Sequence, residues 1–380
     1  MRKPFVIILI ATLVASATAT FWWHQRTQRI NEEITDVTIG ALVPITGHLS
    51  AIGEQMQNGM EMAKADLVAA GVVKSLTIIY EDACSEATSW VAAKKLVEQD
   101  KVKVIGSSFC IFGQDAIMPF TEANKIIIFN TAGNPKELLN KKYGFSTNTT
   151  VEHEGRQLAD FAYHALHARS AAIIHLDSSF GRGYRDGFAK RFESLGGKVV
   201  FTQAKHHISE DFHESLEKIK QANPDVLFIA HFGTSLGHAI IQARELGIQS
   251  KIIGEYESED STVTRLAKEA TEGMIISYPE QIPLTAKMID FEKRYEDKYG
   301  DDPNLLAKNA YDGVMLQVTT FVKCKGNTDC MAHDFEKIKN YNGVSGSITI
   351  NSDHSVIKPI HFKIIQSGKF IPFSAPYDKH

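Results

Sequence analysis

The sequence predicts an α/β protein with two similar lobes, each built on a parallel central sheet. Short apolar runs alternate with segments of helical periodicity between residues 37 and 129, and again between residues 154 and 270. This strand–helix rhythm implies parallel pairing with right-handed crossovers. The length of 380 residues is also too great for one ordinary core, which favours two domains.

The first unit has four expected strands and three expected helices. The strands are residues 37–43, 76–80, 102–105 and 125–129, and the helices are 53–70, 87–98 and 115–123. An irregular stretch follows to residue 150. The second unit has expected strands at 171–176, 198–201, 226–232, 251–255 and 274–278, with helices at 154–166, 184–195, 212–221, 236–246 and 263–270. Helices at 286–299 and 305–324 then precede a strand-rich tail, residues 347–373.

Composition excludes some classes of function. A net charge of −4 and a pI near 6.4 argue against nucleic acid as a partner, because nucleic-acid binding usually needs a basic face. The 43% of hydrophobic and 23% of charged residues are typical of a soluble globular protein.

The amino terminus predicts export. Arg2 and Lys3 precede an apolar run over residues 5–19, and Ala17-Thr18-Ala19 fits a small-residue cleavage pattern. We therefore expect residues 1–35 to be a signal peptide plus a polar tether. The alternative is an uncleaved membrane anchor, which we disfavour because Thr, Ser and Ala dilute the second half of the run. Either way the folded part lies outside the cytoplasm, in the periplasm.

A binding site is expected where two neighbouring strands end. The run over residues 102–105 ends at Gly106 in a loop that carries Cys110, and strand 76–80 is followed by Cys84. Ligands of open α/β sheets bind beyond the carboxyl ends of such strands. Two cysteines at the same end of one sheet also come within bridging distance, so we expect a Cys84–Cys110 disulfide at the site.

A second disulfide is expected after the helix at 305–324. Cys324 and Cys330 are separated by five residues, and export favours a local bridge between them. The alternative is a pair of free thiols.

Three motifs suggest chemistry, and each has a simpler explanation that we favour. Residues 233–237 match G-x-S-x-G between a strand and a helix, but no glycine-rich oxyanion loop precedes them, and Ser235 also suits a helix N-cap. Residues 181–187 are one residue too long for a dinucleotide fingerprint. Three histidines lie close in sequence and could suggest zinc: His206, His207 and His213. A zinc site usually needs acidic or thiol ligands that converge with them, and the sequence shows none. We therefore expect no cofactor and no metal.

The order of several short motifs resembles the type I periplasmic solute-binding proteins of the leucine/isoleucine/valine-binding class, which serve ABC importers. The resemblance runs from about residue 37 to residue 373. It is carried by the segments Ile39–Pro44 with Thr46-Gly47, Glu81–Cys84, Val104-Ile105-Gly106, Ala310-Tyr311-Asp312, Gly343–Gly346 and Lys358-Pro359.

This resemblance implies a fold and a division into lobes. The family has two Rossmann-like lobes joined by three crossings, closing on a solute in the cleft between them. Residues 36–150 and 278–350 would form lobe 1, and residues 151–277 and 351–380 would form lobe 2. The resemblance also implies a disulfide between Cys84 and Cys110.

The resemblance implies a set of site residues too. In the amino-acid binders, a serine after the second cysteine and a threonine after the next strand hold the ligand. Here Ile111 and Ala132-Gly133-Asn134 stand in those places, a departure from the amino-acid pattern. The other cleft loops match Ile52, Phe180, Phe232 and Glu255-Tyr256-Glu257.

The chemistry of these loops predicts the kind of solute. An apolar solute body is favoured by the side chains of Phe109, Ile111, Phe112, Phe180 and Phe232. Backbone N–H groups from Cys110 to Phe112 would take a carboxylate. Glu255 and Glu257 would take an ammonium; the alternative is that they form a solvated loop face. We therefore expect a small zwitterion or amine, with branched-chain amino acids first and aromatic ones next.

Three functions remain open at this stage. The leading one is a monomeric, non-enzymatic binding protein that hands a small solute to a membrane permease. The second is an exported ligand-sensing receptor subunit on the same fold. The third is a serine hydrolase that acts through Ser235.

Overall fold

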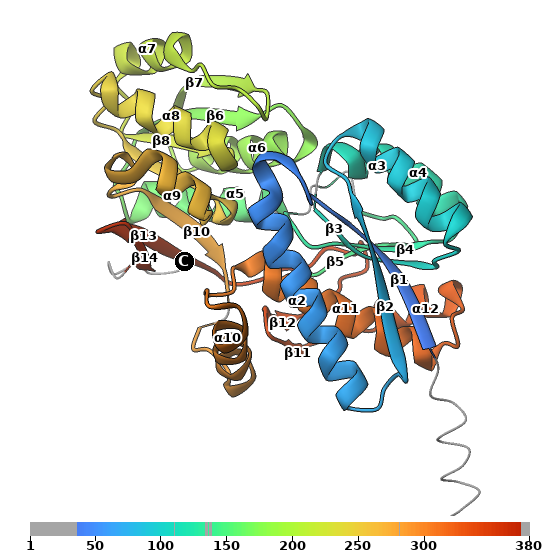
Figure 1. Ribbon diagram of the computed structural model, residues 1–380. Coiled ribbons are helices and arrows are strands. Elements are labelled where there is room, and N and C mark those ends of the chain that lie inside the picture. Colours follow the sequence, from blue (N-terminus) through green and yellow to red (C-terminus); the bar gives the residue numbers. More distant parts are fainter. Residues whose placement is uncertain (1–35, 110, 134–135, 137–138, 281, 374–380) are drawn as a thin grey trace, which may run out of the picture.

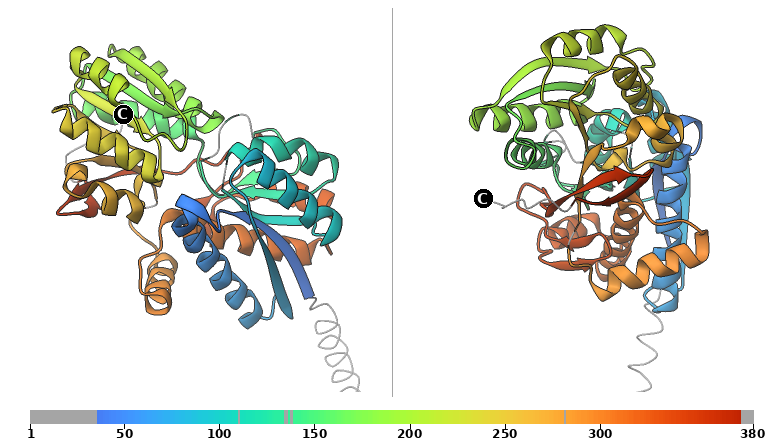
Figure 2. Two further views of the ribbon diagram at one scale, coloured as in Figure 1. Left: turned by 45° about the horizontal axis from the view of Figure 1, so that its top comes forward. Right: turned by 90° about the vertical axis from the view of Figure 1, so that its left-hand side faces the viewer.

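The computed structural model describes residues 36–109, 111–133, 136, 139–280 and 282–373. Two α/β lobes lie side by side, with the green-to-yellow part of the chain in one lobe and the blue-to-cyan part in the other (Figures 1 and 2). Each lobe is built around its own sheet. The predicted fold class is confirmed.

The first lobe contains a five-stranded parallel sheet. Its order is β2-β1-β3-β4-β5, with β1 at Asp36–Val43, β2 at Ser75–Asp82, β3 at Val104–Ser108, β4 at Ile127–Asn130 and β5 at Gly144–Ser146. The helices between these strands are α2 (Ser50–Ala69), α3 (Glu86–Lys94, continued by a π-helical turn at Lys95–Gln99) and α4 (Ile111–Ala123).

Later parts of the chain complete this lobe. They are α10 (Ala286–Tyr299), α11 (Leu305–Lys323), α12 (Thr328–Phe335) and a small hairpin of β11 (Tyr341–Gly343) and β12 (Gly346–Ile348). α11 packs against α2 and β3. A Cβ on Gly59 would lie only 2.1 Å from the backbone oxygen of Ala307, so the approach of α2 to α11 requires glycine there.

The second lobe contains a seven-stranded mixed sheet. Its order is β14-β13-β10-β9-β8-β6-β7, with β6 at Ser170–Leu176, β7 at Lys198–Lys205, β8 at Val226–Ala230, β9 at Lys251–Gly254, β10 at Ile275–Pro279, β13 at Ile360–Gln366 and β14 at Lys369–Pro372. Strands β6 to β10 are parallel as predicted, whereas the tail adds β13 and β14 as an antiparallel edge. The α-helices are α5 (Val151–His164), α6 (Ser179–Ser194), α7 (His213–Ala222), α8 (Gly233–Glu245) and α9 (Ser261–Ala267).

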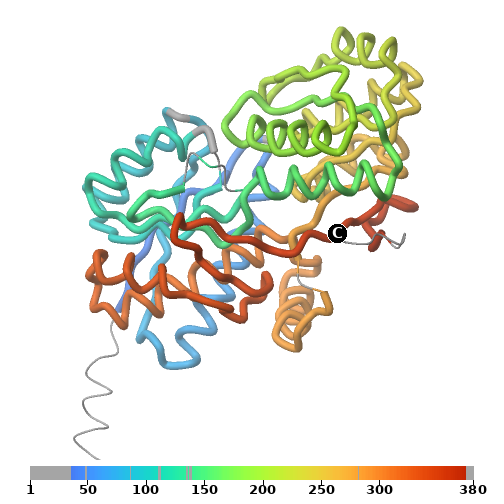
Figure 3. The backbone as a smooth tube through the Cα atoms, turned by 180° about the vertical axis from the view of Figure 1, so that it is seen from behind, coloured from blue at the N-terminus to red at the C-terminus, as the bar shows by residue number. Residues whose placement is uncertain are grey.

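The chain passes between the two sheets three times: after β5, after β10, and between β12 and β13. Seen from behind, the third crossing is the red segment that runs from one lobe to the other (Figure 3). It touches the first crossing through a bridge between Thr149 and Val356. The exact residue boundaries of the lobes stay a prediction.

Several element boundaries differ from the sequence-based prediction. β3 does not end at Gly106 but includes Ser107 and Ser108, which are both buried; the Ser107 hydroxyl lies 2.9 Å from that of Thr131. The stretch expected to be irregular before residue 150 contains β5. α6 begins at Ser179 instead of residue 184, because the Ser178 side chain accepts a hydrogen bond from the Gly181 N–H.

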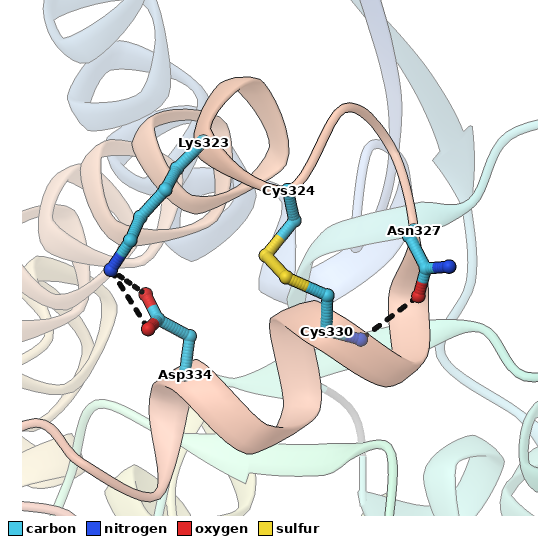
Figure 4. Close-up of a disulfide and its surroundings, with 5 residues drawn as sticks. All are labelled: Lys323, Cys324, Asn327, Cys330 and Asp334. Atoms are coloured by element: carbon cyan, nitrogen blue, oxygen red, sulfur yellow. Dashed lines mark hydrogen bonds and ion pairs between the residues drawn. A yellow bond between two sulfur atoms is a disulfide. The ribbon is translucent and has the colours of Figure 1, made fainter.

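The helix α12 was not predicted, and it carries one of the cysteines. Cys324 and Cys330 form a disulfide with an S–S distance of 2.07 Å (Figure 4). The Asn327 side chain accepts a hydrogen bond from the Cys330 N–H at 2.9 Å, which starts α12 within the bridged loop. Cys84 is also disulfide-bonded, while its predicted partner Cys110 lies outside the described residues.

No helix in the described part of the chain is both long and apolar enough to span a membrane. The predicted signal peptide or anchor, residues 1–35, lies outside the described residues.

Candidate functional site

Three of the predicted phenylalanines meet between the lobes. Phe109 follows β3 in the first lobe, whereas Phe180 lies in the first turn of α6 and Phe232 precedes α8 in the second. The ring centroids of Phe109 and Phe232 are 6.2 Å apart, and those of Phe180 and Phe232 are also 6.2 Å apart. All three side chains are buried. The lobes therefore contact each other at the predicted site.

The loop after β4 touches the second lobe. Ala132 and Gly133 are buried there, and the Asn130 side chain fixes the loop by accepting from the Ala132 N–H and donating to the Gly133 oxygen. A Cβ on Gly133 would lie 2.6 Å from the Val151 side chain and 2.8 Å from the Phe180 ring, so this close approach favours glycine. The Gly133 backbone faces the Glu257 carboxyl of the second lobe and lowers its pKa, against the larger opposing effect of burial.

Glu255 and Glu257 are both buried just beyond β9, so the alternative of a solvated loop face is wrong. The Glu257 N–H donates to Glu255 Oε2 at 2.6 Å, and the Tyr256 hydroxyl donates to Glu257 Oε1 at 2.9 Å. Glu255 Oε1 is buried and has no hydrogen-bond partner within the described structure. Such an unsatisfied oxygen calls for a donor that the described chain does not supply.

A third carboxyl group, that of Glu154, lies beside this pair. Its Oε2 accepts from the Tyr184 hydroxyl at 2.6 Å, and its Oε1 accepts from the Ser277 hydroxyl. The Tyr256 backbone also faces the Glu154 carboxyl and lowers its pKa. We call Glu154, Glu255 and Glu257 the carboxyl cluster.

Burial sets the electrostatics of the carboxyl cluster. Desolvation raises the pKa of Glu154 to about 7 and that of Glu257 to about 8. Burial and the neighbouring carboxyls together raise the pKa of Glu255 well above its usual range. Among the described residues, no Lys, Arg or His side chain forms an ion pair with any of the three. The cluster thus has acceptors and potential negative charge without a cation.

The two tyrosines in contact with the cluster are hydrogen-bond donors. Burial raises the pKa of both Tyr184 and Tyr256 well above the usual value, so both hydroxyls keep their protons. They stabilise the ionised form of their partners, Glu154 and Glu257, against the effect of burial.

Ile52 connects this region to an open pocket. With Tyr256 and Glu257 it lines a small cavity of about 10 Å³. A larger pocket of about 860 Å³ lies next to it between α2, α9, α10, α11 and the β13–β14 hairpin. The two pockets share Ile52, Glu259, Asp260 and Asn304. The walls of the larger pocket are mostly polar and charged, and buried Lys308 forms ion pairs there with Glu280 and Glu292. The predicted site is therefore adjacent to an interlobe opening.

Some predicted site residues are not placed. Cys110 and Asn134 lie outside the described residues, and only the backbone is described for Ile111 and Phe112, at the start of α4. The anion site expected at the N–H groups of residues 110–112 stays a prediction.

The other motifs are not brought together into a site. Ser235 lies within α8, is buried, and donates to the Ser209 backbone oxygen at 2.6 Å. It does not cap the helix as predicted, because the N-cap is Phe232. Within the described chain, no group of three or more His, Cys, Asp or Glu residues is arranged to hold a metal ion.

Sequence reasoning missed Glu154, Tyr184 and Ser277. A signal for Glu154 was present: it falls on the apolar face of α5, three residues after Val151 and four before Leu158, and both of these are buried. An acidic residue at such a position is buried unless the helix turns away from the core. Nothing comparable marks Ser277 within the apolar run of β10.

Comparison with known proteins agrees with this architecture. The profile of the family described as "Periplasmic binding protein" matches residues 36–369. The Leu/Ile/Val-binding protein of Citrobacter freundii is 23% identical over 67% of this chain and 71% of its own length. The leucine-, isoleucine-, valine-, threonine- and alanine-binding protein of Pseudomonas aeruginosa is 24% identical over 74% of this chain and 76% of its own.

Solved structures share the fold. A leucine-binding protein of Thermotoga maritima superposes with a TM-score of 0.83 and 23% identity, over 89% of this chain and 98% of its own. A solute-binding protein of R. palustris in complex with benzoate superposes with a TM-score of 0.79 and 17% identity, over 91% of this chain and 98% of its own.

The match to the family profile spans most of the chain, so this chain belongs to the periplasmic binding protein family. It is a type I periplasmic binding protein, and the relatives reported above are named as amino-acid-binding proteins and not as enzymes. The hydrolase alternative is thereby set aside.

Proposed function

We propose that this protein captures a small solute with a cationic nitrogen and an apolar body, and delivers it to the permease of an ABC importer. Branched-chain amino acids are the first candidates and aromatic amino acids the next. The protein acts as a monomer in the periplasm after its signal peptide is cleaved.

The observation that carries the proposal is the carboxyl cluster without a cation. Two carboxyls that are ionised and buried side by side repel each other, and each loses its hydration. A solute ammonium supplies both the missing positive charge and a donor for Glu255 Oε1. An anionic solute would instead face three acidic side chains.

The second support is the apolar surface next to the cluster. Phe180 stacks edge-on against Tyr184, which itself donates to Glu154, so aromatic surface and carboxyls adjoin. Aliphatic carbon buried on such rings gains about 25 cal/mol per Å². We therefore assign the solute contacts to Ile52, Phe109, Cys110, Ile111, Phe112, Ala132, Gly133, Asn134, Phe180, Phe232, Glu255, Tyr256 and Glu257.

The names of the relatives favour the same class of solute. The relatives from C. freundii and P. aeruginosa are both named for binding leucine, isoleucine and valine, and the second also for threonine and alanine. One solved structure of the same fold is a complex with benzoate, so an organic acid is the natural competing solute class.

A titration with matched solutes tests the proposal. Leucine, isoleucine, valine and phenylalanine are compared by calorimetry with 3-methylbutylamine, which lacks the carboxylate, and with 3-methylbutanoate and benzoate, which lack the ammonium. We expect binding of the amino acids and no binding of the two acids. Binding of the acids alone would refute the assignment of the carboxyl cluster to a cation.

A further inference from the structure

The loop after β4 carries two of the proposed solute contacts, Ala132 and Gly133, and is held by a residue of α11. We call residues 131–133 the solute loop. The Asn309 side-chain amide donates to the Thr131 backbone oxygen at 2.9 Å, and both residues are buried. A buried backbone oxygen that loses its donor costs free energy, so this hydrogen bond fixes the start of the solute loop.

The same asparagine also contacts two of the three crossings between the lobes. Its side-chain oxygen accepts from Lys358 Nζ at 2.9 Å, and Lys358 lies in the third crossing, two residues before β13. Its backbone oxygen accepts from the Thr147 hydroxyl at 3.2 Å, and Thr147 directly follows β5, where the first crossing begins. Asn309 therefore contacts the solute loop and both of these crossings.

Lys358 determines which way the Asn309 amide points. The Lys358 amino group donates to the amide, and the Thr131 carbonyl can only accept from it. The amide oxygen therefore faces Lys358 and the amide nitrogen faces Thr131. Lys358 is itself buried and donates to the Ser345 hydroxyl at 2.8 Å and to the Ser345 backbone oxygen at 3.0 Å. The Ser345 hydroxyl in turn donates to the buried Asp312 carboxylate, so Lys358 is fixed in the position from which it orients Asn309.

A second buried amide on α11 allows a comparison within the same helix. Gln317 lies about two turns further along and donates to the Ile105 backbone oxygen at 3.1 Å. It is buried like Asn309, and Ile105 lies within β3 and is not one of the proposed solute contacts. The two amides thus share their burial and the kind of hydrogen bond they donate. They differ in that Asn309 contacts the solute loop and the crossings.

We propose that Asn309 is a positioning residue for solute binding, which holds the solute loop in its binding geometry and is oriented by Lys358 of the third crossing. This inference rests on the proposed function, because it takes the solute loop to contact the solute. It adds a role in affinity for two side chains that lie outside the proposed contacts. Through them, the solute loop and the third crossing are coupled.

The test compares three variants of the full chain by calorimetry with leucine. Asn309→Leu removes the amide, Lys358→Met removes the group that orients it, and Gln317→Met is the matched control, because it removes a buried amide from the same helix. Each variant loses a buried hydrogen bond, so the melting temperature should fall in all three. A loop that is not fixed beforehand must be ordered on binding. We therefore expect Asn309→Leu and Lys358→Met to raise the dissociation constant about 5- to 30-fold, and Gln317→Met to leave it unchanged.

The double variant tests whether the two residues act together. If Lys358 acts through Asn309, then Asn309→Leu combined with Lys358→Met should bind leucine little more weakly than Asn309→Leu alone. Equal losses of affinity in all three single variants, or additive losses in the double variant, would overturn the proposal. If Asn309→Leu does not fold, Asn309→Asp takes its place, since it keeps the oxygen that accepts from Lys358 and removes the donor to Thr131.

If the wild type binds neither leucine nor any other cationic solute, the proposed function fails, and hydrogen exchange in the solute-free protein still decides the inference. The amides of the solute loop should exchange faster in Asn309→Leu and in Lys358→Met than in the wild type, relative to the amides of β8 in the other lobe. Gln317→Met should leave this ratio unchanged. An unchanged ratio in the first two variants would contradict the inference independently of any solute.

Discussion

Replacing Glu257 by glutamine should weaken solute binding while leaving the fold intact. Glutamine keeps an oxygen that can accept from the Tyr256 hydroxyl, so the local structure is retained. It removes the charge that the solute ammonium is proposed to meet. The same reasoning applies to Glu255→Gln, whose Oε1 lacks any partner in the described structure.

The magnitude follows from the burial of these side chains. Glu255 and Glu257 are at most 3% exposed, so water does not screen the interaction. A hydrogen bond to a charged group contributes about 1.5–3 kcal/mol. At about 1.4 kcal/mol per factor of ten, each substitution should raise the dissociation constant by roughly 10- to 150-fold. The double variant should lose less binding free energy than the sum of the two single variants, because the neighbouring Glu255 and Glu257 carboxyls repel each other.

The assay is calorimetry with leucine or the tightest solute from the screen, with melting temperature as the check on folding. Glu214→Gln is the control, because Glu214 is an exposed residue of α7 that pairs with Lys218, and it should bind as the wild type does. These changes should not weaken the binding of neutral or acidic solutes. Wild-type affinity for an ammonium-bearing solute in both single variants would refute the role of the cluster.

Other predictions concern the rest of the molecule. Titration of unfolded, unreduced protein should find no free thiols, and four reactive thiols would exclude both disulfides. Changing Cys324 and Cys330 to serine should lower the unfolding free energy by about 2 kcal/mol, as expected for so short a loop, and unchanged denaturant midpoints would contradict this. Small-angle scattering should show compaction when solute is added, with rotation near Thr150, Ser277 and Ile350; an unchanged profile at saturation would argue against closure. Burial lowers the pKa of Lys358 to about 7. Above that pH the folded state therefore binds fewer protons than the unfolded state. The stability of the wild type should then rise relative to that of Lys358→Met from about pH 7 to about pH 10. Parallel melting curves for these two proteins would exclude that titration.

The fold was predictable because its signals are local. Apolar runs such as Val226–Ala230 and the helical periodicity of Ala286–Tyr299 mark elements whose type depends on nearby residues. β5 was missed because Gly144–Ser146 is only three residues long, and its pairing with β4 is a tertiary contact.

The site was only partly predictable. The expectation that ligands bind at loops after strands predicted Phe109, Phe180 and Phe232 as site residues, and the structure brings these rings together. The location of Glu154 beside Tyr256 depends on how α5 packs against α6 and β10, which no short pattern encodes. Ser235 shows the opposite case, in which a motif matches a catalytic pattern but its hydroxyl is buried and bonded to backbone.

A crystal structure of the protein with bound leucine, or with the tightest solute from the screen, tests the central claim most directly. The account predicts the solute nitrogen at about 2.8 Å from a carboxylate oxygen of Glu255 or Glu257, with its aliphatic part against the rings of Phe180 and Phe232. A solute carboxylate in contact with Glu257, or a solute bound away from the carboxyl cluster, would contradict it.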